Sequence, residues 1–182
     1  MNFKTKPDRE TSKLEPPHST DTERAVLGAV LRDADALNSV IDILDEPEHF
    51  YVPKHREIFR AMLHLYNSSE ACDLTTVADE LLRVGMLEQI GGRVYLVGLV
   101  EDMRSAANAA EYARRILDYS LTRRLISAST EIIESCQGSD REVEALLDDA
   151  ERTIFDISEK RIRKGFVHIK SPLHDTIERL DS

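Results

Sequence analysis

The chain has 182 residues and a formal net charge of −10 at pH 7, with 41% hydrophobic and 5% aromatic residues. This length suits one domain, or one domain with an appendage, and few aromatics favour aliphatic packing, as in helical bundles. The acidic balance makes the chain a poor binder of polyanions. Two widely separated cysteines indicate reduced thiols and a cytoplasmic location. No apolar run is long enough to span a membrane, and the N-terminus lacks a signal-peptide core.

The first half of the chain predicts a tail followed by a globular helical subdomain. Residues 1–16 mix charges with prolines, so we expect a disordered tail. The subdomain, residues 17–106, begins where Thr20 and Glu23 have the form of a capping box before the apolar run 25–31. We interpret that run as a central helix because it is apolar on nearly every side.

Punctuating residues predict the helices that follow. Residues 35–44 suit a short helix that is closed by Pro47, and Pro53 and Asp73 suit the starts of two more. Gly85 suits a helix end. A Gly91-Gly92 turn precedes the apolar run 94–100, which we interpret as a helix rather than a strand.

Residues 107–162 predict a long antiparallel helical hairpin. No Gly or Pro interrupts 99–137, Gly138 suits a helix end, and Ser139 with Glu142 has capping-box form. At about 100° per residue, one apolar stripe of the first helix faces the second helix. Its members are Leu121, Leu125, Ala128, Ile132 and Cys136.

Four large apolar residues of the hairpin lie off these stripes. Ile126 and Ile133 are a heptad apart and roughly 100° from the first stripe, and Phe155 and Ile162 are off the stripe of their own helix. Either the same domain or another chain covers them. A first helix ~43 Å long exceeds the width of a small domain, which favours another chain.

Residues 163–182 predict a linker with a short docking helix. Ser171-Pro172 suits a helix start, and Leu173, Ile177 and Leu180 then line one side. A helix of about eleven residues is marginal alone in water, so we expect it to dock on another body.

Catalytic and metal-binding patterns do not occur in the sequence. It lacks a P-loop and any pair of histidines at i and i+4. Cys136 lies on the apolar stripe, where we expect a buried, inert thiol. We therefore expect no catalytic, metal or cofactor site in this chain.

One alternative is a winged-helix DNA-binding regulator, because Thr75 to Leu99 fits a helix, turn, helix and wing. From Asp73 to Arg104, however, the sequence contains six acidic and three basic residues. A groove-binding surface needs the opposite balance to neutralise phosphates.

The order of several short segments carries a family resemblance. They are Pro17-His18-Ser19, 23–28, Phe50-Tyr51, 55–59, 73–77, Gly91-Gly92 with Tyr95-Leu96, 105–108 and Tyr112-Ala113. This ordered set resembles the N-terminal domain of bacterial replicative helicases of the DnaB family, and the resemblance runs from about residue 16 to the end.

The resemblance implies a non-catalytic role. Family proteins continue into a RecA-like ATPase motor, so ATP and Mg are expected only there. Their N-terminal domains form dimers through the hairpin, and three dimers build a collar on the hexameric ring. A DnaG-type primase docks on that collar, a helicase loader is a further candidate partner, and DNA is contacted only indirectly, through the full ring.

The family pattern assigns residues to three surfaces of this chain. Primase docking is implied for Tyr95, Ile126, Ile132 and Ile133, although Ile132 lies on the main stripe and is expected to support the hairpin. Self-association is expected at Leu146, Ile154 and Phe155. Docking of the linker helix on a neighbouring motor domain is implied for Leu173, Ile177 and Leu180.

Overall fold

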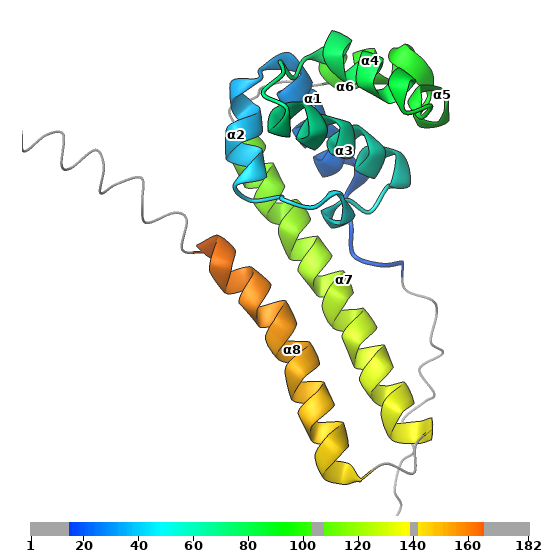
Figure 1. Cartoon of the computed structure of the whole chain (residues 1–182), viewed down its shortest axis with the longest axis vertical. Coiled ribbons are helices and arrows are strands. Elements are labelled where there is room, and N and C mark those ends of the chain that lie inside the picture. Colours follow the sequence, from blue (N-terminus) through cyan, green and yellow to red (C-terminus); the bar gives the residue numbers. More distant parts are fainter. Residues whose placement is uncertain (1–14, 103–107, 139–141, 166–182) are drawn as a thin grey trace, which may run out of the picture.

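A head of short helices lies at one end of a long two-helix hairpin (Figure 1). The computed structural model describes residues 15–102, 108–138 and 142–165, and within these ranges the chain is helical with no strand. The predicted all-α fold is confirmed. The elements are α1 (Thr20–Arg32), α2 (Asp35–Ile41), η1 (Pro47–His49), α3 (Pro53–Asn67), α4 (Leu74–Arg83), α5 (Leu87–Ile90), α6 (Gly92–Glu101), α7 (Ala109–Gly138) and α8 (Val143–Gly165).

Helix α1 is the centre of the head, and it packs against α2, α3, α6 and α7. The whole run from Val26 to Leu31 is buried, as the sequence predicts for a helix without a polar face. The start of α1 differs from prediction, because Ser19 is the N-cap and its side chain accepts from the backbone N–H of Thr22 at 3.3 Å. Glu23 takes no part in a capping box and is 2% exposed.

The loop after α2 carries an apolar residue into the core without a helix. Helix α2 ends at Ile41, earlier than predicted, because the N–H groups of Ile43 and Leu44 both turn back to the carbonyl of Val40. Leu44 is nevertheless fully buried. Hydrophobic burial thus includes Leu44 although its backbone lies outside the helix.

Helices α3 to α6 follow the punctuation of the sequence. Pro53 begins α3, and Asp73 caps α4 in a reciprocal box with Thr76. Gly91 and Gly92 have φ of +104° and +70°, values that only glycine adopts readily, and they bring the chain from α5 into α6. Residues 92–101 form a helix where the winged-helix alternative needed a wing, so that interpretation is wrong.

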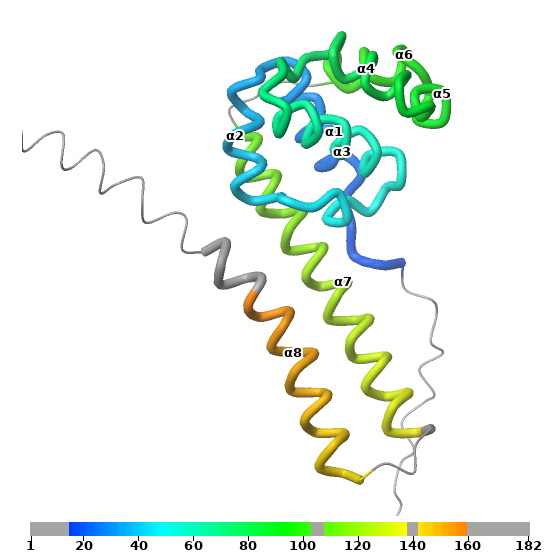
Figure 2. Tube along the Cα trace, viewed as in Figure 1, coloured from blue at the N-terminus to red at the C-terminus, as the bar shows by residue number. Residues whose placement is uncertain are grey.

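Helices α7 and α8 form the predicted hairpin and run side by side below the head (Figure 2). The 30 residues of α7 span about 45 Å, and Gly138 is its last residue. Helix α8 starts at Val143, later than the capping-box pattern implies, with Glu142 accepting its first helical hydrogen bond from the N–H of Leu146. Ser139 lies outside the described residues. The helix also runs to Gly165, beyond the expected end of the hairpin at 162.

Two predicted segments lie outside the part of the chain that the structure describes. They are residues 1–14 of the expected tail and the expected docking helix with Leu173, Ile177 and Leu180.

Candidate docking surfaces

The hairpin exposes large apolar side chains along much of its length. Ile126 and Ile133 are 52% and 55% exposed, and Phe155 is 64% exposed. The described residues leave about half or more of each of these side chains uncovered, so the described part of the domain does not bury them. The side chain of Ile162 lies outside the described residues. The exposed apolar residues of the hairpin are Leu125, Ile126 and Ile133 on α7, and Val143, Leu147, Ile154 and Phe155 on α8.

Most of this apolar surface lies on one side of the hairpin. We measure each position as a rotation about its helix axis, starting from the side that faces the other helix. Leu125 lies about 50° from that side on α7, and Val143, Leu147 and Ile154 lie about 90° from it on α8. The rotation has the same direction along the chain on both helices. Because the helices are antiparallel, these residues therefore lie on the same face of the hairpin. Ile126 and Ile133 continue this face around the outer edge of α7.

A groove between α7 and α8 contains other predicted residues. Ile132 is half-buried and lines it together with Cys136 and Leu146. Leu146, expected at a self-association surface, thus contributes to the inside of the hairpin. Cys136 is exposed, so the expected burial of its thiol is wrong. Among the described residues, each helix packs mainly against the other beyond the head and buries only a narrow strip. Leu125, near the middle of α7, is 46% exposed.

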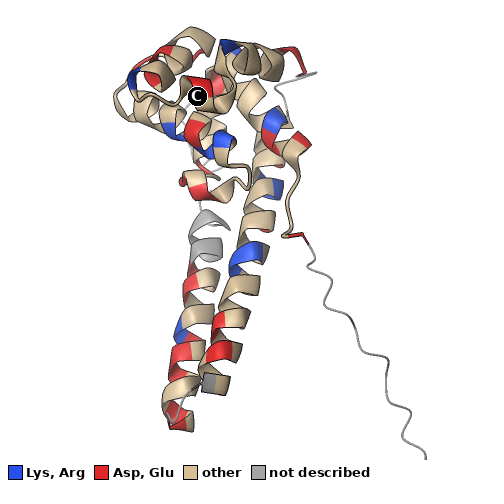
Figure 3. Cartoon of the chain, turned by 90° about the vertical axis from the view of Figure 1, so that its right-hand side faces the viewer, with Lys and Arg blue, Asp and Glu red and all other residues tan. Residues whose placement is uncertain are grey.

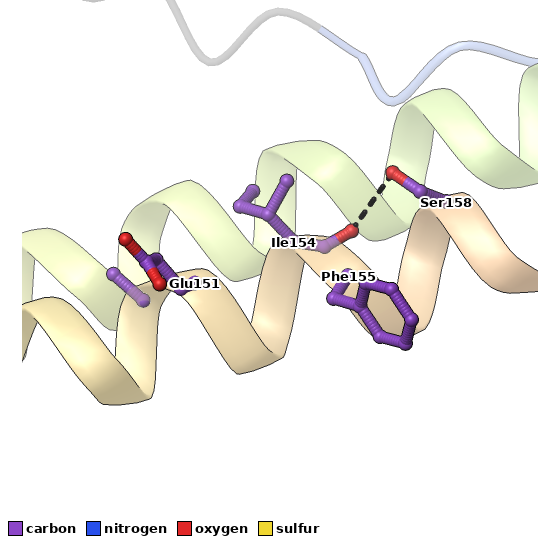
Figure 4. Close-up of a pocket in the computed structure, with 5 residues that line it drawn as sticks. Glu151, Ile154, Phe155 and Ser158 are labelled. Atoms are coloured by element: carbon purple, nitrogen blue, oxygen red, sulfur yellow. Dashed lines mark hydrogen bonds between the residues drawn. The ribbon is translucent and has the colours of Figure 1, made fainter.

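A shallow pocket lies on the outer surface of α8 (Figure 4). Ala150, Glu151, Ile154, Phe155 and Ser158 line it. The Ile154 and Phe155 side chains point in different directions, and the Ser158 hydroxyl donates to the Ile154 carbonyl at 3.1 Å. Both apolar side chains are exposed, Ile154 by 39% and Phe155 by 64%.

Acidic residues recur along much of α8, where the ribbon is coloured red (Figure 3). Between 143 and 159 the sequence has six acids and one base, Arg152. Helices with this balance are usually solvated, although a basic partner can use them. The acids are Glu144, Asp148, Asp149, Glu151, Asp156 and Glu159.

Arg123 joins the hairpin to the head at the point where α7 leaves it. Its guanidinium donates to the carbonyls of Pro17 at 2.8 Å and His49 at 2.7 Å, and it lies 5.6 Å from the ring centre of Tyr51. Burial lowers the pKa of this guanidinium. Next to it, Arg124 pairs with Glu46 at 2.6 Å. These contacts end just before Ile126, beyond which α7 has little cover.

Tyr95 lies in a polar network on the head. It is half-buried on α6, and its hydroxyl lies 2.7 Å from Nε2 of His55 and 3.2 Å from a guanidinium nitrogen of Arg24. His55 is fully buried, and its Nδ1 lies 2.7 Å from the carboxylate of Glu23. The same carboxylate accepts from the backbone N–H of Tyr51 at 2.6 Å and of Val52 at 3.2 Å. The network therefore fixes the position of Tyr95.

Sequence reasoning missed this network. The sequence pattern predicts Glu23 as part of a helix cap, and His55 has no spacing that indicates a partner. The available signal was an acid at the start of an otherwise apolar helix, which demands hydrogen-bond donors once it is buried. Through Tyr51 the network reaches Arg123, so it connects Tyr95 to the base of the exposed part of α7.

The described residues offer no cluster of His, Cys, Asp and Glu able to hold a metal ion. Among those residues, no helix is long and apolar enough to cross a membrane. The Cys72 thiol is buried, and burial raises its pKa to about 12.

Residues 15–118 match the family model "DnaB-like helicase N terminal domain". The chain belongs to this family. Among curated relatives, the replicative DNA helicase DnaB of Geobacillus stearothermophilus is 40% identical over 166 residues, which cover 91% of this chain and 36% of that protein. The replicative DNA helicase DnaC of Bacillus subtilis (strain 168) is 37% identical, with 91% and 37% covered. The chain thus spans about a third of the length of these two DnaB-family relatives.

Solved structures share the DnaB N-terminal fold. The N-terminal domain of DnaB helicase from Mycobacterium tuberculosis superposes with a TM-score of 0.73 at 37% identity, covering 78% of this chain and 99% of that chain. A second structure, described as a DnaB-like replicative helicase and its interactions with primase, gives a TM-score of 0.64 at 27% identity. It covers 76% of this chain and 31% of that chain.

Proposed function

We propose that this chain works as the assembly and docking part of a cytoplasmic replicative helicase, without catalysis of its own. It forms dimers through the hairpin and recruits a DnaG-type primase. The observation that carries the proposal is the exposed apolar surface of the hairpin, above all Ile126 and Ile133, which no described residue covers. A soluble chain rarely leaves so large an apolar face without a partner.

Primase docking is proposed for Tyr95, Ile126 and Ile133. Support comes from their exposure or fixed position and from a 27% identical structure that is described with its primase interactions. Ile132 was assigned to the same surface, but it lines the groove between the helices, so we propose that it holds the backbone of its neighbours in place.

Self-association is proposed for the outer surface of α8, where Ile154 and Phe155 are exposed. Leu146 supports this surface from inside the hairpin. In the full protein, three such dimers would form a collar on a hexameric ring whose motor domains bind ATP and Mg and contact DNA. We also propose that Leu173, Ile177 and Leu180 dock the linker on a neighbouring motor domain, and that a helicase loader is a further partner.

The primase interaction is tested by Ile126→Asp, with Leu82→Asp as the control. Leu82 is 60% exposed on α4 of the head, so both variants place a charge on an exposed helix position. Calorimetric titration with the C-terminal domain of the cognate primase should show roughly 30-fold weaker binding for Ile126→Asp, or about 2 kcal/mol, as for a buried interface anchor. Leu82→Asp should bind normally. Equal affinity of both variants and the unchanged chain would remove Ile126 from the docking surface.

Self-association is tested by light scattering at micromolar concentration. The unchanged chain should form dimers or larger species, and Phe155→Asp should shift the population to monomers because a charge enters an apolar contact. If the unchanged chain stayed strictly monomeric, this part of the proposal would be contradicted.

A further inference from the structure

Tyr95 is proposed above as a docking residue, but its hydroxyl is already engaged inside the domain. One ring nitrogen of His55 and one guanidinium nitrogen of Arg24 lie within hydrogen-bonding distance of the hydroxyl oxygen. A phenol has one proton to donate and an oxygen to accept, and these two neighbours can satisfy both roles. A partner therefore meets the ring of Tyr95 and whatever lies on it.

A lysine lies on that ring. The Nζ atom of Lys54 is 3.7 Å from the ring centre of Tyr95, close enough for a cation–π contact. Lys54 is half-buried, and it is the only lysine in the sequence between residues 14 and 159. The contact holds the ammonium group against the proposed docking residue.

The positive charge of Lys54 is not neutralised within the described residues, where no carboxylate comes within ion-pair distance of it. Neighbouring cations differ: Arg24 pairs with Asp102, and Arg60 pairs with Glu48 and Glu57. Arg56 donates to the carbonyls of Phe50 and Tyr51. In a chain of net charge −10, Lys54 is thus a fixed cation with no carboxylate partner among the residues that the structure describes.

Lys54 lies at the N-terminal end of α3, an unfavourable place for a positive charge. It is the second residue of α3, whose first turn has no acid and whose N-cap residue, Val52, makes no side-chain capping bond. A cation at the N-terminal end of a helix is disfavoured by the helix dipole, whereas an anion is favoured there. A carboxylate that bound Lys54 would be attracted both by the ammonium group and by the partial positive charge at the N-terminal end of α3.

We propose that Lys54 is a further docking residue, which binds a carboxylate side chain of the primase beside the ring of Tyr95. The inference rests on the proposed function and adds the chemistry of one contact. The apolar residues of the hairpin would supply most of the affinity, while Lys54 orients the partner through a charge-assisted hydrogen bond.

The test uses Lys54→Gln, which removes the charge, and Lys54→Arg, which keeps it. Arg60→Gln, on the same helix with its charge already paired, is the control. Calorimetric titration with the C-terminal domain of the cognate primase should show about five- to tenfold weaker binding for Lys54→Gln and near-normal binding for Lys54→Arg and Arg60→Gln. The affinity of Lys54→Gln should also fall less steeply with added KCl, because one screened ion pair is gone. Thermal unfolding should match that of the unchanged chain.

Three results would overturn the inference. In the first, Lys54→Gln binds with unchanged affinity and salt dependence while Ile126→Asp binds weakly, so the proposed function stands and Lys54 is not part of it. In the second, Lys54→Gln changes self-association and leaves primase binding intact, which assigns the lysine to a second copy of the chain. In the third, the unchanged chain does not bind primase at all, and the proposed docking function fails together with the inference.

Discussion

Replacing Glu23 by Gln tests whether the buried carboxylate stabilises the head. Its two oxygens accept three hydrogen bonds, from Tyr51, Val52 and His55. Glutamine has nearly the same shape but only one acceptor oxygen, so its amide nitrogen must face a donor. With the oxygen kept toward Val52 and His55, the buried N–H of Tyr51 loses its partner.

The magnitude follows from that geometry. A hydrogen bond to a carboxylate contributes about 1.5–3 kcal/mol, and a buried donor left without a partner costs about 1–3 kcal/mol. We expect Glu23→Gln to lower the free energy of unfolding by about 3 kcal/mol. For a chain of this size, that corresponds to a fall in Tm of ~6–12 °C.

Circular dichroism during thermal and urea unfolding measures this loss on the all-helical fold. The control is Glu48→Gln, which removes a solvent-exposed carboxylate that pairs with Arg60, and which should cost no more than about 0.5 kcal/mol. If Glu23→Gln were as stable as the control, the reasoning from burial and unmatched donors would be refuted.

Two more predictions concern the thiols and the cap of α4. A thiol reagent should label the exposed Cys136 of the native chain and should reach Cys72 only on unfolding. The reason is that Cys72 is buried, and burial raises the pKa of its thiol to about 12. Rapid labelling of both cysteines would contradict this prediction. Asp73→Ala should cost about 1 kcal/mol in urea unfolding, since it removes an N-cap. Hydrogen bonds from the N–H groups of Thr76 and Thr75 lower the pKa of Asp73, so its contribution is present above the ordinary pKa and is lost as pH falls below it. The free energy of unfolding of Asp73→Ala should therefore fall less steeply at acid pH than that of the unchanged chain. The same pH dependence in both proteins would argue against this assignment.

Local signals predicted several helix boundaries of this chain. Pro53, Asp73 and Gly91 act within one turn, so their effect on the backbone can be read without knowing the fold. The long α7 followed from the absence of any helix breaker over 99–137, together with Gly138. The wheel predicted only that Ile126 and Ile133 do not pack on the same neighbour as the stripe, and the structure then showed both to be exposed.

Other features depended on residues far apart in the sequence. Glu23 is polar by composition and buried by structure, because its donors come from residues 28–32 positions later. Cys136 lies on the predicted stripe and is still exposed, because within the described part of the chain two packed helices alone cannot cover each other's flanks.

The sequence by itself therefore determined most of the helices, their order and the excess apolar surface of the hairpin, but not η1 or α5. Periodicity and capping act over about four residues, and these features need nothing more. The tertiary structure alone decided which side chains find cover and which charges find partners. Lys54 shows this most clearly, since its place on the ring of Tyr95 joins residues 41 positions apart. Burial and electrostatics depend on the whole surrounding surface, and no local pattern contains that information.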